Sequence, residues 1–75
     1  MSRKIVSEHG VLGGEPHLKG TRIRVSDVST KYEELGYTID EIEKAYERLE
    51  TEDIEAALSY FYRNKNSEIA EGETA

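Results

Sequence analysis

The sequence predicts a mainly α-helical fold, a three-helix bundle with a helix-turn-helix, preceded by a short N-terminal β-ribbon. Residues 36–58 contain two helix-start signals, at Thr38 and Thr51, each followed by apolar residues at helical spacing. Two amphipathic helices so close in sequence must cross sharply to share one core, although any small helical hairpin fits the same pattern. Residues 1–25 contain β-prone runs separated by glycine-containing turns, which are typical of a ribbon.

The ribbon is predicted from two runs, residues 4–7 (KIVS) and residues 22–25 (RIRV). Residues 13–16 (GGEP) form a loop between them, and residues 18–21 (LKGT) form a tight turn. The glycine pair is not a phosphate cradle, because such a loop leads directly into a helix and this one leads into another strand candidate. A ribbon this short needs support from the helices or from a second subunit.

The second run alternates charged and apolar residues, so its two faces differ. We expect Ile23 and Val25 to face the core and Arg22 and Arg24 to face outward. The two arginines are candidates for contacting phosphates or a partner's carboxylates. A charged edge strand that blocks aggregation explains them equally well.

The first helix is predicted to begin after Ser26, which can cap it, with Asp27 at its positive end. Gly36 ends it. Its apolar stripe consists of Val28, Tyr32 and Leu35.

The second helix begins with a capping box formed by Thr38 and Glu41, and Tyr37 and Ile42 are placed as a hydrophobic staple. Its stripe follows spacings of three, four and seven residues. The stripe residues are Ile39, Ile42, Ala45, Tyr46 and Leu49.

The third helix is predicted to begin after Thr51, whose hydroxyl can cap it, with Glu52 and Asp53 at the positive end of its dipole. The run Ser59–Tyr62 adds three aromatic side chains, more than one stripe can bury. Its stripe residues are Ile54, Ala57, Leu58 and Phe61.

The aromatic end of the third helix and the residues after it supply the candidates for binding a protein partner. Residues 66–75 (NSEIAEGETA) are polar and acidic, so we expect a flexible tail with one isolated apolar residue. Alternatively, the aromatic side chains only cover the small core, and the tail is a solvated segment that binds no partner. The candidate residues are Tyr60, Tyr62, Arg63 and Ile69.

The net charge of −6 is unevenly distributed along the chain. Residues 1–25 hold five basic and two acidic side chains, residues 26–66 hold five basic and eleven acidic ones, and residues 67–75 hold three acids. An acidic helical body repels nucleic acid, whereas a basic arm can contact phosphates. A solvated surface is the alternative. The nucleic-acid-binding candidates are Arg3, Lys4, Lys19, Arg22 and Arg24.

Composition limits the remaining possibilities. Seventy-five residues with 36% hydrophobic content form one domain with a small core, which favours a homo-oligomer, a dimer above all, or a protein partner. We divide it into a ribbon arm (1–25), a helical bundle (26–65) and a tail (66–75). The absence of cysteine and of long apolar runs predicts a soluble cytoplasmic protein without a membrane segment.

The sequence contains no motif that is typical of an enzyme or of a protein that binds a metal or cofactor. His9 and His17 are separated by a glycine-containing loop, and no acidic residues complete a metal-ligand set on one helix face. No serine stands in a nucleophile motif. We therefore expect no catalytic residues, no metal site and no cofactor.

The combined motifs resemble the domain of unknown function 433 family of small bacterial and archaeal proteins. The resemblance covers residues 4–62. It is carried by Gly13-Gly14-Glu15-Pro16, Gly20-Thr21-Arg22-Ile23, Val25, Gly36, Glu41-Ile42, Tyr46, Leu49, Asp53-Ile54 and Ala56-Ala57-Leu58.

This resemblance implies a homeodomain-like three-helix fold with an N-terminal ribbon, and a role as the antitoxin of a type II toxin-antitoxin system. Family antitoxins are thought to neutralise a nuclease-like toxin and to bind DNA through the helix-turn-helix. Residues 51–62 then take the recognition-helix position and residues 20–25 that of the ribbon motif. Two hypotheses follow: an antitoxin-like protein-interaction module, or a transcriptional regulator that binds duplex DNA.

The chain departs from the family pattern at Arg24 and Glu47, where relatives often have proline, and at Glu50, where they often have threonine. Without proline at position 47, we expect the second helix to run longer. The start of the third helix offers carboxylates, among them Asp53, where a recognition helix would face DNA. This favours the protein-interaction hypothesis.

Overall fold

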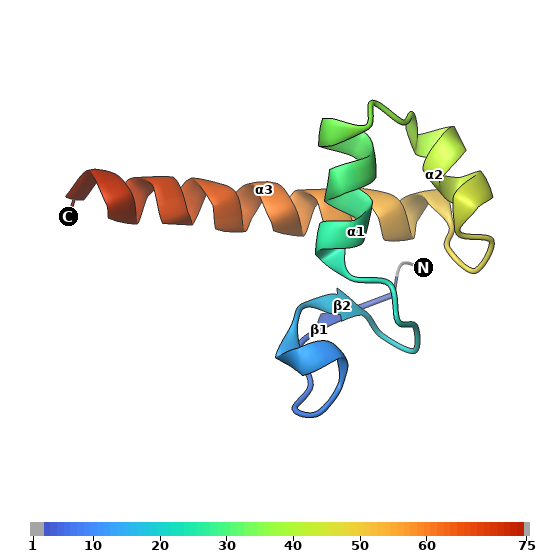
Figure 1. Ribbon diagram of the computed structural model, residues 1–75, viewed down its shortest axis with the longest axis horizontal. Helices are drawn as coiled ribbons and strands as arrows, with labels where there is room; N and C mark the ends of the chain where they lie inside the picture. The colour runs from blue at the N-terminus through green and yellow to red at the C-terminus, as the bar shows by residue number, and fades with distance from the viewer. Residues whose placement is uncertain (1–2, 75) are drawn as a thin grey trace.

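A computed structural model describes the backbone of residues 3–74 and the side chains of residues 3–64. It confirms the predicted fold class, because three helices and a small antiparallel sheet near the N-terminus make up the described chain (Figure 1). The elements in order are β1 (Ile5–Val6), a 3-10 turn η1 (Leu12–Gly14), β2 (His17–Leu18), α1 (Val25–Ser29), a π-helical turn η2 (Thr30–Glu34), α2 (Ile39–Ala45) and α3 (Thr51–Thr74).

Helix α3 is the element on which the others pack. Helix α1 crosses it, α2 lies near its beginning, and both strands contact it on another side (Figure 1). One buried core therefore joins the strands and all three helices. Its members are Leu18, Val25, Val28, Ile42, Leu49, Ile54, Ala57 and Leu58.

The strand pairing differs from the predicted ribbon. β1 pairs with β2, placing Ile5 opposite Leu18, whereas residues 22–25 only touch the other side of β2 through one bridge between His17 and Arg24. The expected pairing was wrong because the 18–21 turn folds residues 22–25 back onto β2, and the chain enters α1 at once.

The faces of the 22–25 segment follow the predicted alternation in its apolar residues. Val25 is buried and Ile23 packs against the core. The backbone N–H of Leu18 donates to the Ile23 carbonyl at 3.0 Å, and that of Val25 donates to the Pro16 carbonyl at 3.0 Å. These bonds seat the segment beside β2.

The first helix begins two residues earlier than expected, at Val25, and Ser26 does not cap it. Arg24 is the N-cap residue, and its backbone N–H donates to Asp27 Oδ2 at 3.0 Å. The aspartate three residues after the cap therefore satisfies the helix start, as the acidic residue of a capping box does.

The predicted stripe of this helix holds only for Val28, which is fully buried; Tyr32 and Leu35 are 38% and 58% exposed. The reason is the π-helical turn η2, in which the Leu35 N–H donates to the Thr30 carbonyl five residues earlier. The wider turn rotates the following side chains away from the core. Gly36, at φ 73°, ends the helix as predicted.

Helix α2 starts with the predicted capping box. The Glu41 N–H donates to Thr38 Oγ1 at 3.1 Å, and the Thr38 N–H donates to Glu41 Oε1 at 2.9 Å. The helix nevertheless ends at Ala45, so the expected extension past position 47 was wrong. A turn in which the Leu49 N–H donates to the Tyr46 carbonyl brings Leu49 back into the core.

The capping box gives a pH-dependence prediction. The Thr38 backbone N–H, then its hydroxyl, holds the pKa of Glu41 below its ordinary value of 4.5. A carboxyl whose pKa is lowered by folding stabilises the protein above its unfolded pKa, and this contribution is lost as the pH falls through the folded pKa. We expect Glu41→Gln to be less stable than wild type at neutral pH, with the difference shrinking below about pH 4.5.

The measurement is the urea midpoint of both proteins from about pH 7 to about pH 3. Glutamine retains the shape and the acceptor that a capping box uses, so it isolates the charge. A midpoint difference that does not change with pH would contradict this account of Glu41.

Helix α3 begins at Thr51, so Thr51 is its first residue. Glu50 precedes it in the cap position, because its carbonyl accepts the Ile54 N–H at 3.2 Å. The Glu50 N–H donates to Asp53 Oδ2 at 2.9 Å. The Thr51 hydroxyl instead donates to Glu43 Oε2 at 2.6 Å, which ties α2 to α3. The expected Thr51 cap was therefore wrong, and as in α1 an aspartate on the first turn satisfies the N-cap N–H.

The backbone of α3 is helical through Thr74, in the segment where the sequence predicted a flexible acidic tail (Figure 1). Alanine and glutamate in this segment are good helix formers and allow the helix to continue. The side chain of Ile69 lies outside the described residues. Within the described part of the chain, no helix is both long and apolar enough to cross a membrane.

Candidate interaction surfaces

Arg3 is used inside the fold rather than held out for phosphates. Its guanidinium donates to the Lys19 carbonyl at 3.2 Å and to the Arg48 carbonyl at 3.5 Å, and its Nε lies 3.9 Å from Asp53 Oδ2. Its backbone N–H also donates to Asp53. Arg3 therefore ties the N-terminal arm to the start of α3.

Arg24 is also neutralised locally. Its Nε lies 2.8 Å from Glu15 Oε2, and its Nη1 lies 4.0 Å from Asp27 Oδ1. The side chain is 38% exposed, so the predicted outward direction holds only in part. Two carboxylates next to this guanidinium reduce its attraction for a phosphate.

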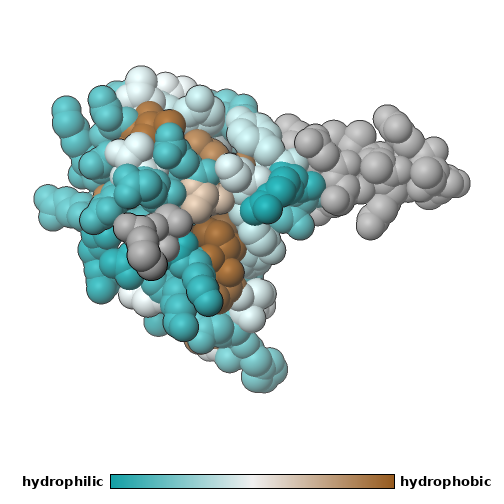
Figure 2. All heavy atoms as spheres, turned by 180° about the vertical axis from the view of Figure 1, so that it is seen from behind, coloured by the Kyte–Doolittle hydropathy of each residue, from teal (hydrophilic) through white to brown (hydrophobic). Residues whose placement is uncertain are grey.

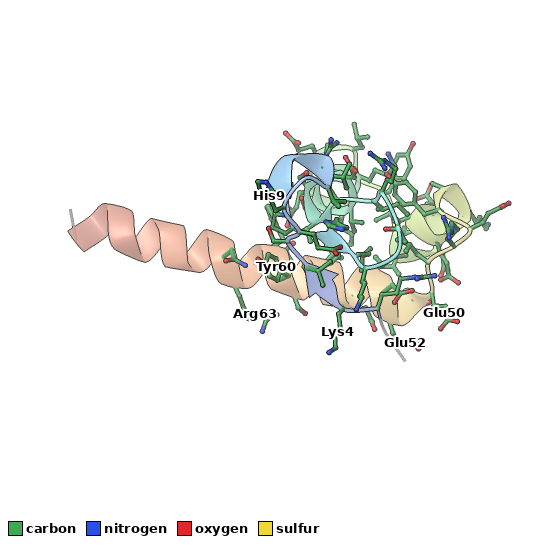
Figure 3. The ribbon with its side chains drawn as sticks, turned by 90° about the horizontal axis from the view of Figure 1, so that it is seen from below. Lys4, His9, Glu50, Glu52, Tyr60 and Arg63 are labelled. Atoms are coloured by element: carbon green, nitrogen blue, oxygen red, sulfur yellow. The ribbon has the colours of Figure 1, made fainter. Side chains whose placement is uncertain are left out.

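Three basic candidates on the arm, Lys4, Lys19 and Arg22, remain exposed. Among the ion pairs of residues 3–64, none involves these three side chains. Lys4 and Lys19 are neighbours, because the Lys19 N–H donates to the Lys4 carbonyl at 2.8 Å. Lys4 points to the same side of the molecule as Arg63 on α3 (Figure 3).

The start of α3 is acidic on its exposed side. Glu52 and Glu55 are exposed. Asp53, in contrast, is only 2% exposed, so the expectation that it would face DNA was wrong. Residues 38–56 hold eight carboxylates and two basic side chains, a net charge of −6.

The buried role of Asp53 had one usable sequence signal. An aspartate on the first turn of a helix can accept the N–H of the residue that precedes the helix. Its second partner, Arg3, lies 50 positions away in the sequence, and no local pattern indicates that contact.

The aromatic candidates lie on α3 where it passes the hairpin loop and η2. Tyr60 is half-buried and packs against the core, and the Tyr62 hydroxyl donates to Glu33 on η2. The Phe61 and Tyr62 rings meet edge to face with centroids 5.5 Å apart. Arg63 points away from the body, and its Nε donates to the Ser59 carbonyl at 3.4 Å (Figure 3).

Two adjacent hollows flank Phe61 on the surface. The first, of about 390 Å³, has a mainly apolar lining, and the second measures about 380 Å³. Figure 2 shows the molecule from behind, with a mostly hydrophilic face that carries a few hydrophobic patches. The first hollow is lined by Glu15, Pro16, Val25, Ser26, Tyr60, Phe61 and Asn64, and the second by Ser26, Ser29, Thr30, Glu33, Glu34 and Phe61.

The two histidines stand in different environments. His17 is buried, with Nδ1 2.9 Å from the Glu15 carbonyl and Nε2 3.3 Å from Glu8 Oε1, whereas His9 is exposed at the other end of the hairpin loop. His17 therefore fixes this loop from inside. Among residues 3–64, no group of three or more histidine, aspartate or glutamate side chains could hold a metal ion.

The architecture defines a class of small helical proteins in which a helix-turn-helix, formed by α2 and α3, is joined to an N-terminal β-hairpin. The model of a family described as "Protein of unknown function (DUF433)" matches residues 5–61, so the chain belongs to that family. No curated protein and no solved structure matches this chain.

Proposed function

We propose that this chain is an antitoxin-like protein-interaction module that binds and neutralises a nuclease-like toxin in the cytoplasm. The observation that carries the proposal is the acidic surface of α2 and the start of α3, where a DNA reader needs positive charge. A nuclease must present basic side chains to its polyanionic substrate. An acidic module attracts such a protein through long-range charge complementarity.

The pairing of two arm arginines with carboxylates of the same chain supports the same proposal. Arg3 and Arg24, two of the five basic candidates on the arm, lie beside carboxylates of their own chain. The partly apolar hollow beside Tyr60 and Phe61 offers the kind of concave, aromatic-lined surface that protein interfaces use.

The test is RNA cleavage by the product of the neighbouring gene, purified with and without this chain. The proposal predicts cleavage by the isolated neighbour and its loss when the chain is added in equimolar amount. A neighbour that has no nuclease activity, or whose activity is unchanged by the chain, would contradict it.

A DNA-binding regulator is the second candidate, favoured by the exposed side chains of Lys4, Lys19 and Arg22. If all three side chains contact phosphates, the logarithm of the DNA-binding constant should fall linearly with the logarithm of the salt concentration, with a slope of about −2.7. The double variant Lys19→Ala, Arg22→Ala should then reduce the slope to about −0.9, whereas Lys44→Ala on α2 should leave it unchanged. The proposed interaction function predicts no measurable duplex binding even at about 50 mM salt, measured by fluorescence anisotropy.

A further inference from the structure

We propose that the two hollows beside Phe61 form one groove that receives an amphipathic segment of the protein partner, with an apolar side chain next to a lysine or arginine. The inference rests on the proposed function and names the surface and the chemistry of the contact. It is carried by the shape of the groove and by the charges on its rim.

The two hollows adjoin each other, because Ser26 and Phe61 line both of them. The groove they form runs between α1 and α3, from the hairpin loop to η2. Pro16, Val25 and Phe61 supply apolar surface at the loop end. An apolar side chain of a partner placed there would lose its contact with water, which is the main favourable term in protein association.

The charges of the groove lining have one sign. Its charged residues are Glu15, Glu33 and Glu34, and no lysine, arginine or histidine lines it among the side chains described. Glu15 is paired with Arg24, and Glu33 accepts the Tyr62 hydroxyl. Glu34 is exposed and takes part in no ion pair within residues 3–64.

The two ends of the groove therefore differ in charge and polarity. At the loop end, apolar surface adjoins a carboxylate that Arg24 already neutralises, so that end suits an apolar side chain. At the η2 end, Glu33 and Glu34 lie without a basic neighbour in the lining, so that end suits a cation. The expected occupant therefore places its lysine or arginine near η2 and its apolar side chain near Pro16.

A second copy of this chain fits the groove less well. In a two-fold symmetric dimer the same patch faces itself, so the carboxylates of the two copies would approach one another. Like charges brought together at an interface oppose binding. A basic segment of a different protein meets the same groove with complementary charge.

The first test blocks the groove at its centre. Ser26 is exposed and lines both hollows, so Ser26→Tyr fills the groove without disturbing the core. Ser59 is exposed on α3 and lines neither hollow, so Ser59→Tyr is the matched control. Titration calorimetry against the purified neighbouring-gene product should show at least about tenfold weaker binding for Ser26→Tyr and a change below about twofold for Ser59→Tyr. Equal affinities of the two variants would overturn the proposal.

The second test identifies the occupant. The photo-crosslinker p-benzoylphenylalanine is placed at position 34 on the rim, or at position 55 as a control on the exposed side of α3. In the complex, position 34 should crosslink to a partner peptide that contains an apolar residue next to lysine or arginine, and position 55 should not. Crosslinking from position 55 alone, or from position 34 to a second copy of this chain, would overturn the groove while leaving the interaction function intact. Absence of any complex would overturn both.

Discussion

Replacing Leu18 with alanine is expected to lower the free energy of unfolding by about 2–5 kcal/mol. Leu18 lies in strand β2, is fully buried, and belongs to the same core as the buried residues of α1, α2 and α3. Removing its side chain leaves a cavity between the hairpin and the helices. The loss should appear as a lower midpoint in urea unfolding with an unchanged slope.

Leu35→Ala is the matched control, because it makes the same chemical change at a side chain that is 58% exposed. Its effect should stay within about 0.5 kcal/mol. If Leu18→Ala were as mild as Leu35→Ala, the hairpin would be an arm attached to the bundle and not a part of its core.

Replacing Asp53 with alanine should cost about 2–3 kcal/mol of stability. The carboxylate is buried and accepts the backbone N–H groups of Glu50 and Arg3, and the Arg3 guanidinium lies beside it. Alanine leaves these donors without their acceptor and releases the N-terminal arm from α3. Urea unfolding measures the loss, and hydrogen exchange at the Arg3 and Glu50 amides locates it.

Asp27→Ala provides the comparison, since Asp27 accepts the N-cap N–H of α1 in the same way but is only half-buried. It should cost about 1 kcal/mol, the usual value of a lost helix-cap bond. Equal costs for Asp53→Ala and Asp27→Ala would mean that the contact with Arg3 adds nothing to stability.

The local signals in the sequence predicted the parts of the fold that depend on neighbouring residues. The predictions of the Thr38–Glu41 capping box and of the helix end at Gly36 were correct, because each feature depends only on residues a few positions apart in the sequence. The starts of α1 and α3 were placed late, at Ser26 and Thr51. In both helices an aspartate on the first turn accepts the N-cap N–H, and this interaction decides the start.

The remaining features depend on contacts between distant segments. The π-helical turn that exposes Leu35 has no sequence signal that we can identify. The groove combines residues of the hairpin loop, of α1 with η2, and of α3, so only the folded chain brings its lining together. The contacts between Arg3 and Asp53 join the N-terminal arm to the start of α3. The charge distribution made Arg3 a nucleic-acid-binding candidate, whereas the family resemblance placed Asp53 on the recognition helix.

The most direct test of the central claim is the native mass, by light scattering, of this chain purified after co-expression with its neighbouring gene. The account predicts one species that contains both proteins, with a mass equal to multiples of 8.5 kDa plus whole copies of the partner. A chain that purifies alone, at 8.5 kDa or an integer multiple of it, would contradict the claim that it acts by binding that partner.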